Sequence, residues 1–323
     1  MAAIKLPGLR SEAYEHPSDA AALNVLKQTA GFKTFVEKFN AYSIERLLRV
    51  QLTGSFICVQ PDSFPELHEI LESTRARLDV SKEVQLYIGV GSEIKAVTVG
   101  VEQTFIVLTT AAAQLLSLEE LAFVISHELG HIKSGHVLYY QIAEFLPSMA
   151  GIVGSFIPGF GEIFTAGIQA ALLYWKRMSE FTADRAGLLG CQDIEVAWRT
   201  MTKFAGLPPK YYATLNTEDF LRQAREFKDL DADTLSKIAK WISAVGAEHP
   251  WTVVRAQQLL EWIECGKYEE TLKNPRRISI QPPAGISGFC PYCGCPLRGK
   301  ETFCPTCGHS LTPAPPVSGA ATS

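Results

Sequence analysis

Two histidines and a glutamate within residues 117–136 have the types and spacing of a metal site. His127 and His131 are four residues apart, so on a helix their rings lie on one face and can bind the same ion. Glu128 directly follows the first histidine, which places its carboxylate beside that ion. There it can take a proton from a zinc-activated water. The pattern predicts half of a catalytic zinc site, with Glu128 as general base.

The residues around this motif have the pattern of a helix. Ser117, with Glu120 three residues later, predicts a capping box at its start. The apolar residues that follow recur at helical spacing: Leu118, Leu121, Ala122, Ile125, Leu129 and Ile132. The alternative interpretation is a pair of histidines on a surface helix, and residues farther along the chain argue against it.

A second segment supplies the residues that the motif lacks. Glu180 begins a run of strong helix formers and is the predicted third zinc ligand. Asp184 lies on the same helix face and can accept the outward N–H of His127 or His131, fixing its tautomer. The alternative is an ordinary charged helix face. His136 is another candidate ligand, but five residues after His131 it points away from the metal face.

The composition indicates a globular protein that is not exported. A chain of 323 residues, 47% hydrophobic, can form one large domain or two smaller ones. The net charge of −4 gives no reason to expect a nucleic-acid partner. The first sixteen residues contain no apolar run typical of a signal peptide. Five of the eight cysteines lie between residues 290 and 307, which favours metal binding in a reducing compartment. We therefore expect a cytoplasmic protein.

Helical spacing predicts helices from about residue 19 to 78, and alternation predicts strands over 84–90, 96–101 and 105–108. We expect these strands to form a small antiparallel sheet just before the metal-binding helix. An exposed edge strand there could hold an extended peptide through main-chain hydrogen bonds. The alternative is a purely structural sheet.

Residues 142–176 are the ambiguous part of the chain. Two uncharged runs, 145–161 and 163–175, are each shorter than the roughly 20 apolar residues that a membrane span needs. The favoured interpretation is a helical hairpin packed over the active site. The alternative is a hairpin that dips into a bilayer, giving a membrane-associated protein with Trp175, Lys176 and Arg177 as interfacial anchors.

The segment from Asp193 to Tyr268 is predicted to be helical, and it contains two further candidates. His249, which precedes Pro250, and Arg255 could together stabilise the oxyanion formed when a carbonyl is attacked. The alternatives are a residue at a helix start for His249 and a surface ion pair for Arg255.

The C-terminal part predicts a second, structural zinc site. After a linker at 274–288, two CPxCG knuckles within residues 289–309 indicate a zinc ribbon, and residues 310–323 are an expected disordered tail. Cys295 is a spare thiol that fits the knuckle spacing less well. The four predicted thiolate ligands are Cys290, Cys293, Cys304 and Cys307.

Taken together, HELGH, SEFTADRAG and HPWTVVR resemble the zinc metallopeptidase family that includes the type I CAAX prenyl proteases and the HtpX-like proteases. The resemblance covers residues 14–268. It implies an α+β, mostly α, zincin-type domain over residues 1–273. It also implies a zinc site of His127, His131 and Glu180, the base Glu128, support from Asp184, and an oxyanion role for His249 and Arg255. Lys95-Ala96 stands where family members often carry Asn-Ala. The named proteins have clear membrane spans, whereas this chain has only the broken apolar stretch described above.

We therefore predict a zinc-dependent metalloendopeptidase that hydrolyses polypeptides, with a role in protein quality control. The alternative is a catalytically silent chaperone or adaptor that uses the zinc ribbon to bind other proteins. A third hypothesis, nucleic-acid binding by the ribbon, is disfavoured by the acidic balance of the chain.

Overall fold

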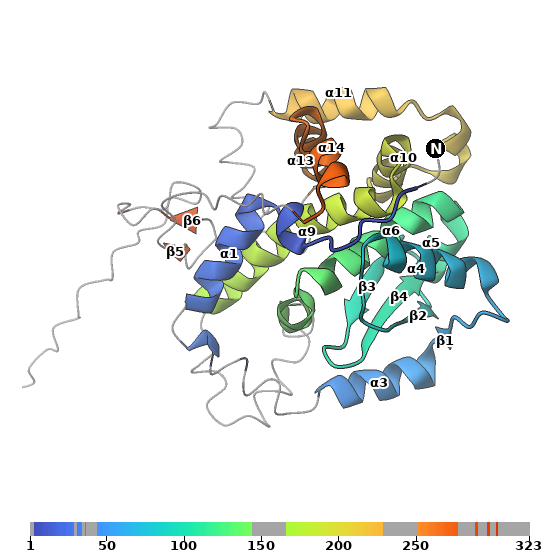
Figure 1. Cartoon of the computed structure of the whole chain (residues 1–323), viewed down its shortest axis with the longest axis horizontal. Helices are drawn as coiled ribbons and strands as arrows, with labels where there is room; N and C mark the ends of the chain where they lie inside the picture. Colours follow the sequence, from blue (N-terminus) through green and yellow to red (C-terminus); the bar gives the residue numbers. More distant parts are fainter. Residues whose placement is uncertain are drawn as a thin grey trace, which may run out of the picture.

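A computed structural model gives the arrangement of most of the chain. The described residues are 3–28, 31–33, 36, 44–143, 166–228, 251–276, 288–289, 296–297 and 302. Helices predominate among them and surround a small sheet (Figure 1). The predicted mostly helical α+β class is confirmed. No helix in this part of the chain is both long and apolar enough to cross a membrane.

Two central helices, α6 and α9, lie side by side and carry the sheet and the remaining helices around them (Figure 1). The α-helices are α1 (Pro17–Gln28), α3 (Ile44–Ser55), α4 (Pro65–Arg77), α5 (Thr110–Leu115), α6 (Leu118–Lys133), α9 (Ala166–Cys191), α10 (Ile194–Phe204), α11 (Thr217–Lys228), α13 (Thr252–Glu264) and α14 (Lys267–Lys273). Two short 3₁₀ helices are η1 (Ser11–Ala13) and η2 (Pro209–Thr214).

Helix α6 begins as its sequence predicts. The Ser117 hydroxyl accepts from the Glu120 N–H, and the Glu120 carboxylate accepts from the Ser117 N–H at 2.7 Å. This reciprocal capping satisfies two of the main-chain donors that a helix start leaves unpaired. The start of the helix that carries the HELGH motif is therefore fixed.

The sheet is small, as predicted, but mixed instead of wholly antiparallel. Its strands are β1 (Ile57–Cys58), β2 (Val84–Gly89), β3 (Ala96–Val99) and β4 (Thr104–Thr109), in the order β1-β2-β4-β3. Strand β3 pairs with β4 antiparallel and lies at the edge, so β4 occupies the centre and runs parallel to β2. The alternation revealed β2, β3 and β4, but not that β3 lies outside β4. It also missed β1, which lies within the residues predicted to be helical.

Side chains alternate strictly between the two faces of this sheet. On one face Ile106 and Leu108 join an apolar cluster with Ile125 of α6. On the other face Val99 and Val107 pack in a second cluster, with the α3 helix beneath them. The sheet therefore separates α6, which carries the HELGH motif, from α3.

Glycines allow α6 and α9 to approach each other closely. A Cβ on Gly130 would lie 2.5 Å from the Ala186 Cβ, and a Cβ on Gly190 would lie 1.9 Å from the Ser126 Oγ. Neither separation is sterically possible for an unshifted side chain. The two helix backbones thus lie close enough for side chains from both helices to bind one ion.

Three residues within α9 were predicted as membrane anchors in the alternative interpretation, and for two of them the prediction is wrong. Trp175 is fully buried, and Lys176 is 1% exposed with its amine over the Tyr140 ring. Buried side chains cannot reach a bilayer surface. Residues 144–165, most of the predicted hairpin, lie outside the described part of the chain.

Candidate functional site

Helices α6 and α9 bring His127, His131 and Glu180 together. Nε2 of His127 lies 3.7 Å from Glu180 Oε2, and Nε2 of His131 lies 3.5 Å from Glu180 Oε1. One ligand atom from each residue lies within 4.8 Å of the others, and all three side chains are buried. Donors bound to one zinc ion at about 2.0–2.2 Å lie roughly 3–4 Å apart, so this set fits zinc.

His131 gives a second indication that these residues hold an ion. Its buried Nε2 forms no hydrogen bond with any residue that the structure describes, although it faces the Glu180 carboxylate. A buried polar atom without a hydrogen bond is costly, and a metal ion would satisfy it. The chemistry and geometry of the donors therefore agree.

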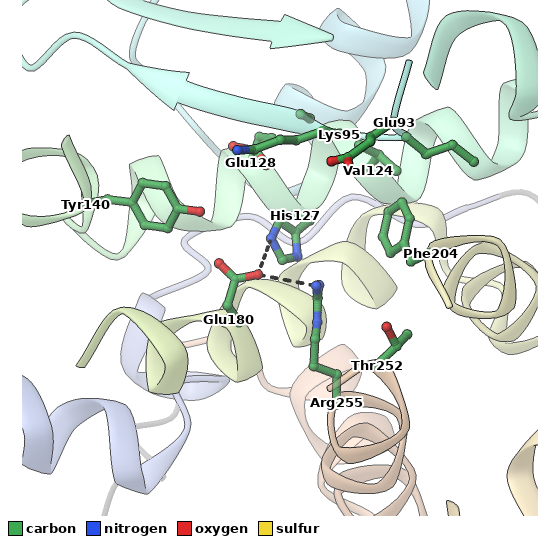
Figure 2. A pocket seen from close by; sticks show the side chains of 12 residues that line it. Glu93, Lys95, Val124, His127, Glu128, Tyr140, Glu180, Phe204, Thr252 and Arg255 are labelled. Carbon is green, nitrogen blue, oxygen red and sulfur yellow. Dashed lines mark ion pairs between the residues drawn. The ribbon is translucent and has the colours of Figure 1, made fainter. Parts of the chain in front are cut away.

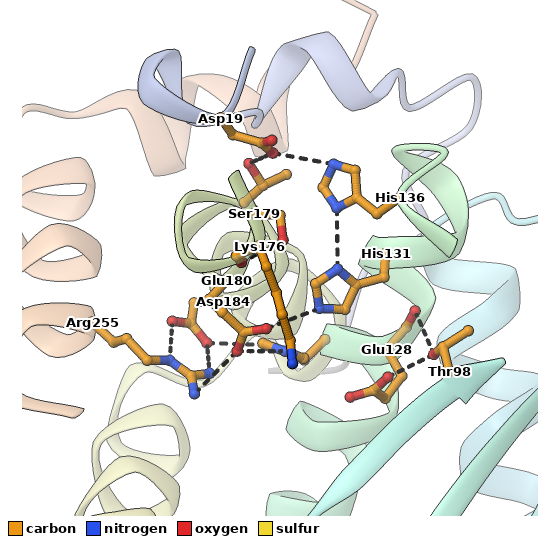
Figure 3. A network of polar contacts seen from close by, with 12 residues as sticks. Asp19, Thr98, Glu128, His131, His136, Lys176, Ser179, Glu180, Asp184 and Arg255 are labelled. Carbon is orange, nitrogen blue, oxygen red and sulfur yellow. Dashed lines mark hydrogen bonds and ion pairs between the residues drawn. The ribbon is translucent and has the colours of Figure 1, made fainter. Parts of the chain in front are cut away.

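Glu128 is held beside this cluster by the edge strand. The Thr98 hydroxyl on β3 donates to Glu128 Oε2 at 2.6 Å, and both side chains are buried (Figure 3). The bond fixes one carboxylate oxygen. Helix α6 thus supplies the acidic group, and a strand supplies its orientation.

A buried ion-pair network supports the cluster from α9 and α13. Asp184 Oδ1 lies 3.0 Å from Nδ1 of His127, and its two oxygens accept from Nε and a terminal nitrogen of Arg255 at 2.8 and 2.5 Å. Another terminal nitrogen of Arg255 lies 3.3 Å from Glu180 Oε2 (Figure 2). Arg255 is therefore a buried ion-pair partner, not a surface one.

These contacts shift the pKa values of the network. Burial alone would raise the pKa of Asp184, but the Arg255 charge and the hydrogen bonds from Arg255 and His127 hold it below its ordinary value. Burial likewise opposes the charge of Arg255, yet the two carboxylates raise its pKa. Asp184 is thus an anion that can accept the Nδ1–H of His127, which leaves Nε2 with its lone pair toward Glu180.

The amino-acid sequence of the chain also matches a known family. Residues 61–263, more than half of the chain, match Peptidase family M48. The chain belongs to this family. A curated relative, Plastoglobule-localized metallopeptidase 48, chloroplastic, of Arabidopsis thaliana, is 28% identical over 274 residues, which cover 84% of this chain and 78% of the relative. No solved structure shows a significant match. The M48 match makes this protein a metalloprotease, an enzyme that acts on polypeptides.

The M48 metallopeptidase has a pocket at the cluster, about 240 Å³ in volume. His127, Glu128 and Glu180 line it, and Lys95 and Ala96 of the edge-strand segment form part of its wall. In Figure 2 the Tyr140 hydroxyl points into the pocket from the side opposite Phe204. The pocket thus combines the candidate ligands, the candidate base and an edge of the sheet.

Several predicted site residues lie outside the described part of the chain. They are His249 and the ribbon cysteines Cys290, Cys293, Cys304 and Cys307. The strands β5 (Gly288–Phe289) and β6 (Pro296–Leu297), which flank the first cysteine pair, form an antiparallel pair. The roles of these five residues therefore remain predictions.

Sequence reasoning missed three residues around the site and the role of a fourth, His136. Thr98 contacts the base, Tyr140 faces the pocket, and Asp19 and His136 extend the network beyond His131 (Figure 3). His136, considered above only as a ligand, lies beyond His131 with its Nδ1 3.1 Å from the Nδ1 of that residue. Its five-residue spacing from His131 was the one signal available, because the other contacts join distant parts of the sequence.

Proposed function

We propose that this M48 metallopeptidase is a zinc-dependent endopeptidase. The convergence of His127, His131 and Glu180 from two helices, with Glu128 beside them, is the observation that carries the proposal. When bound, zinc lowers the pKa of a water molecule towards about 7 and polarises the carbonyl to be attacked. Among N and O ligand sets, two imidazoles and one carboxylate are typical of catalytic zinc.

Glu128 would act as the general base. Its carboxylate lines the pocket, and Thr98 holds Oε2, so it is oriented to accept the proton of the attacking water. The same carboxylate would then return the proton to the leaving amine. Asp184 would keep His127 in the tautomer that offers Nε2 to the metal.

Arg255, His249 and Tyr140 are the proposed donors to the oxyanion. Arg255 lines the pocket while three of its nitrogens contact Asp184 and Glu180, so its position is fixed before substrate arrives. Tyr140 lines the same pocket, and Figure 2 shows its hydroxyl directed inward. The contribution of His249 rests on its match to the family sequence.

The outer edge of β3, which pairs with no further strand among the described residues, would bind the substrate. The Thr109 N–H donates to the Lys95 carbonyl at 3.0 Å, so Lys95 faces β4 with its main chain. In an antiparallel pair the next residue and every second one after it turn their main-chain groups to the other side, which are Ala96 and Thr98 here. An extended peptide can pair with these groups irrespective of its sequence.

A structural zinc in the ribbon and peripheral membrane contact through residues 142–176 complete the proposal. The β5–β6 pair around the first cysteine pair supports a ribbon that starts near residue 288, after the peptidase domain of residues 1–273. The printed name of the Arabidopsis relative places that protein at plastoglobules. By analogy, we propose that this protein is membrane-associated. On its sequence alone we propose a cytoplasmic location, a role in protein quality control and no nucleic-acid partner.

Zinc content and casein cleavage test the proposal together. We expect two zinc ions per chain, and one after His127 and His131 are both replaced by alanine. Glu128→Gln should keep both ions and abolish cleavage. Glu119→Gln, on the exposed first turn of the same helix, is the matched control and should cleave normally. Wild-type cleavage by Glu128→Gln would exclude the mechanism, whereas a wild-type protein that binds zinc but cleaves no substrate would favour the adaptor hypothesis.

A further inference from the structure

A second pocket lies on the face of the sheet that is turned away from α6. Its volume is about 240 Å³, and Leu52 of α3 and Phe56, just after that helix, form one wall while Val97 and Val107 form the sheet side. These side chains are apolar, so the pocket favours an aliphatic or aromatic group over a charged one. Of the described site residues, His127, Glu128, Glu180 and Arg255 do not line it.

This second pocket adjoins the active-site pocket at one point of the edge strand. Lys95 and Ala96 line both. Beyond them the strand alternates. Thr98 turns toward Glu128, whereas Val97 turns toward α3. The free edge of β3 therefore has the catalytic pocket on one face and the apolar pocket on the other.

An extended peptide paired with this edge would have the same alternation. Successive side chains of a strand point to opposite faces, so every second substrate side chain would face the metal cluster. The side chains between them would face the pocket beneath α3. One strand of substrate could thus occupy both pockets at once.

We propose that the pocket beneath α3 binds an apolar side chain of the polypeptide substrate and sets sequence preference at alternate positions next to the cleaved bond. This inference rests on the proposed function, because it assumes a substrate paired with β3. The main chain of the substrate would be held by Ala96 and Thr98, and the selective contact would come from Leu52, Phe56 and Val97.

Peptide selectivity provides the test, measured in two ways on the full-length, zinc-loaded protein. The first is the ratio of kcat/KM for peptides with leucine or phenylalanine to those with alanine at each position. The second is the ratio of Kd values for the same peptides bound to Glu128→Gln, which needs no cleavage. An apolar pocket of this kind typically discriminates by about tenfold or more, so we expect that ratio at one or more alternate positions.

Two variants should remove the preference. Val97→Phe fills the pocket from the half-buried strand side, and Gln51→Glu places a carboxylate in its wall at an exposed helix position. Each should lower the leucine-to-alanine ratio by about fivefold or more. Val101→Phe is the matched control, since this residue lies just beyond β3, is 38% exposed and does not line the pocket. It should keep the wild-type ratio.

The outcomes separate this inference from the proposed function. Unchanged ratios in both Val97→Phe and Gln51→Glu would overturn the pocket assignment, even if Glu128→Gln abolishes cleavage as expected. If these two variants kept the peptide ratios but no longer bound phosphatidylglycerol vesicles, the pocket would be assigned to a lipid chain instead. Conversely, loss of the preference in Kd in Val97→Phe and Gln51→Glu would support the pocket assignment. It would do so even if cleavage persisted in Glu128→Gln and the catalytic proposal failed.

Discussion

Nδ1 of His131 lies 3.1 Å from Nδ1 of His136, and this contact sets the direction of a buried hydrogen-bond chain. If Nε2 of His131 binds a metal, its Nδ1 carries the proton and donates to His136. His136 must then carry its own proton on Nε2, which lies 3.1 Å from Asp19 Oδ2. The orientation of a candidate zinc ligand thus depends on α1, outside residues 61–263 that match the family.

Asp19 is suited to end this chain of hydrogen bonds. It is fully buried and accepts from the Trp175 indole at 2.9 Å and the Thr182 hydroxyl at 2.5 Å. Burial alone would raise the pKa of Asp19, but its contacts with His136 and the hydrogen bond from Thr182 keep it below its ordinary value. The carboxylate therefore stays ionised, with its Oδ2 3.1 Å from Nε2 of His136.

Loss of this chain should weaken zinc binding. Asp19→Asn and His136→Gln should each lower the affinity of the catalytic site by about 10–100-fold, as expected when a ligand loses its outer hydrogen-bond partner. The double variant should lose little more than either single one, because both act through His131. Competition with a chromophoric chelator measures the affinity. His68→Ala, a histidine on α4 outside the network, is the control. Unchanged affinity in both single variants would contradict the prediction.

Thr98 should affect catalysis without affecting the metal. Thr98→Val keeps the shape of the side chain but removes the hydroxyl that donates to Glu128 at 2.6 Å. A hydrogen bond to a charged group contributes about 1.5–3 kcal/mol, so kcat/KM should fall by roughly tenfold or more. Thr98→Ser restores the donor and should recover most activity. Zinc affinity should stay constant in both, and a Thr98→Val protein with wild-type kcat would show that the contact does not position the base.

The sequence predicts what depends on neighbouring residues. The capping box of α6, the i, i+4 histidines and the Glu180–Asp184 pair follow from helical geometry, and the structure brings them together. The contacts that orient them are not local. Thr98 is 30 residues from Glu128, and Asp19 is 117 residues from His136. The strand order that places β3 at the edge depends on packing against α6 and α3, which alternation alone does not specify.

His16 should make stability depend on pH. Its Nδ1 accepts from the Ser18 N–H at 3.1 Å at the start of α1, and its Nε2 lies 2.9 Å from the Gln258 amide oxygen. Burial, with a contribution from the Arg185 charge, lowers the pKa of His16 to about 4. The unfolded chain binds the proton more tightly, so this stabilisation is complete above about pH 6.5 and is lost as the pH falls toward 4.

His16→Asn isolates this effect because asparagine keeps an acceptor for the Ser18 N–H but does not titrate. Between pH 7.5 and pH 5 the wild type should lose about 2 kcal/mol more unfolding free energy than the variant. Urea unfolding at the two pH values measures both losses. Parallel pH dependences in the two proteins would show that His16 is protonated without cost in the folded state.

Substitution of glycine by alanine should have opposite effects at Gly190, where α6 and α9 approach closely, and at Gly54, which lies in α3. In Gly190→Ala the new Cβ would lie 2.3 Å from the Ser126 Cβ, an atom that no rotamer change can move away, so the helices must separate. We expect a loss of about 1–3 kcal/mol of stability. Zinc affinity should also fall, because Ser126 precedes His127. A Cβ on Gly54 in α3 meets no atom of the described residues within 4 Å, so Gly54→Ala should raise stability by about 0.5–1 kcal/mol.

A second substitution distinguishes this steric effect from a general cost of changing Gly190. Ser126→Gly removes both atoms that the new Cβ would meet, so it should restore zinc affinity in the Gly190→Ala background even though glycine weakens α6 by about 1 kcal/mol. Ser126→Ala keeps the clashing Cβ and should not restore it. Equal recovery in the two double variants, or a Gly190→Ala protein as stable as the wild type, would mean that the helices can part without disturbing the ligands they carry.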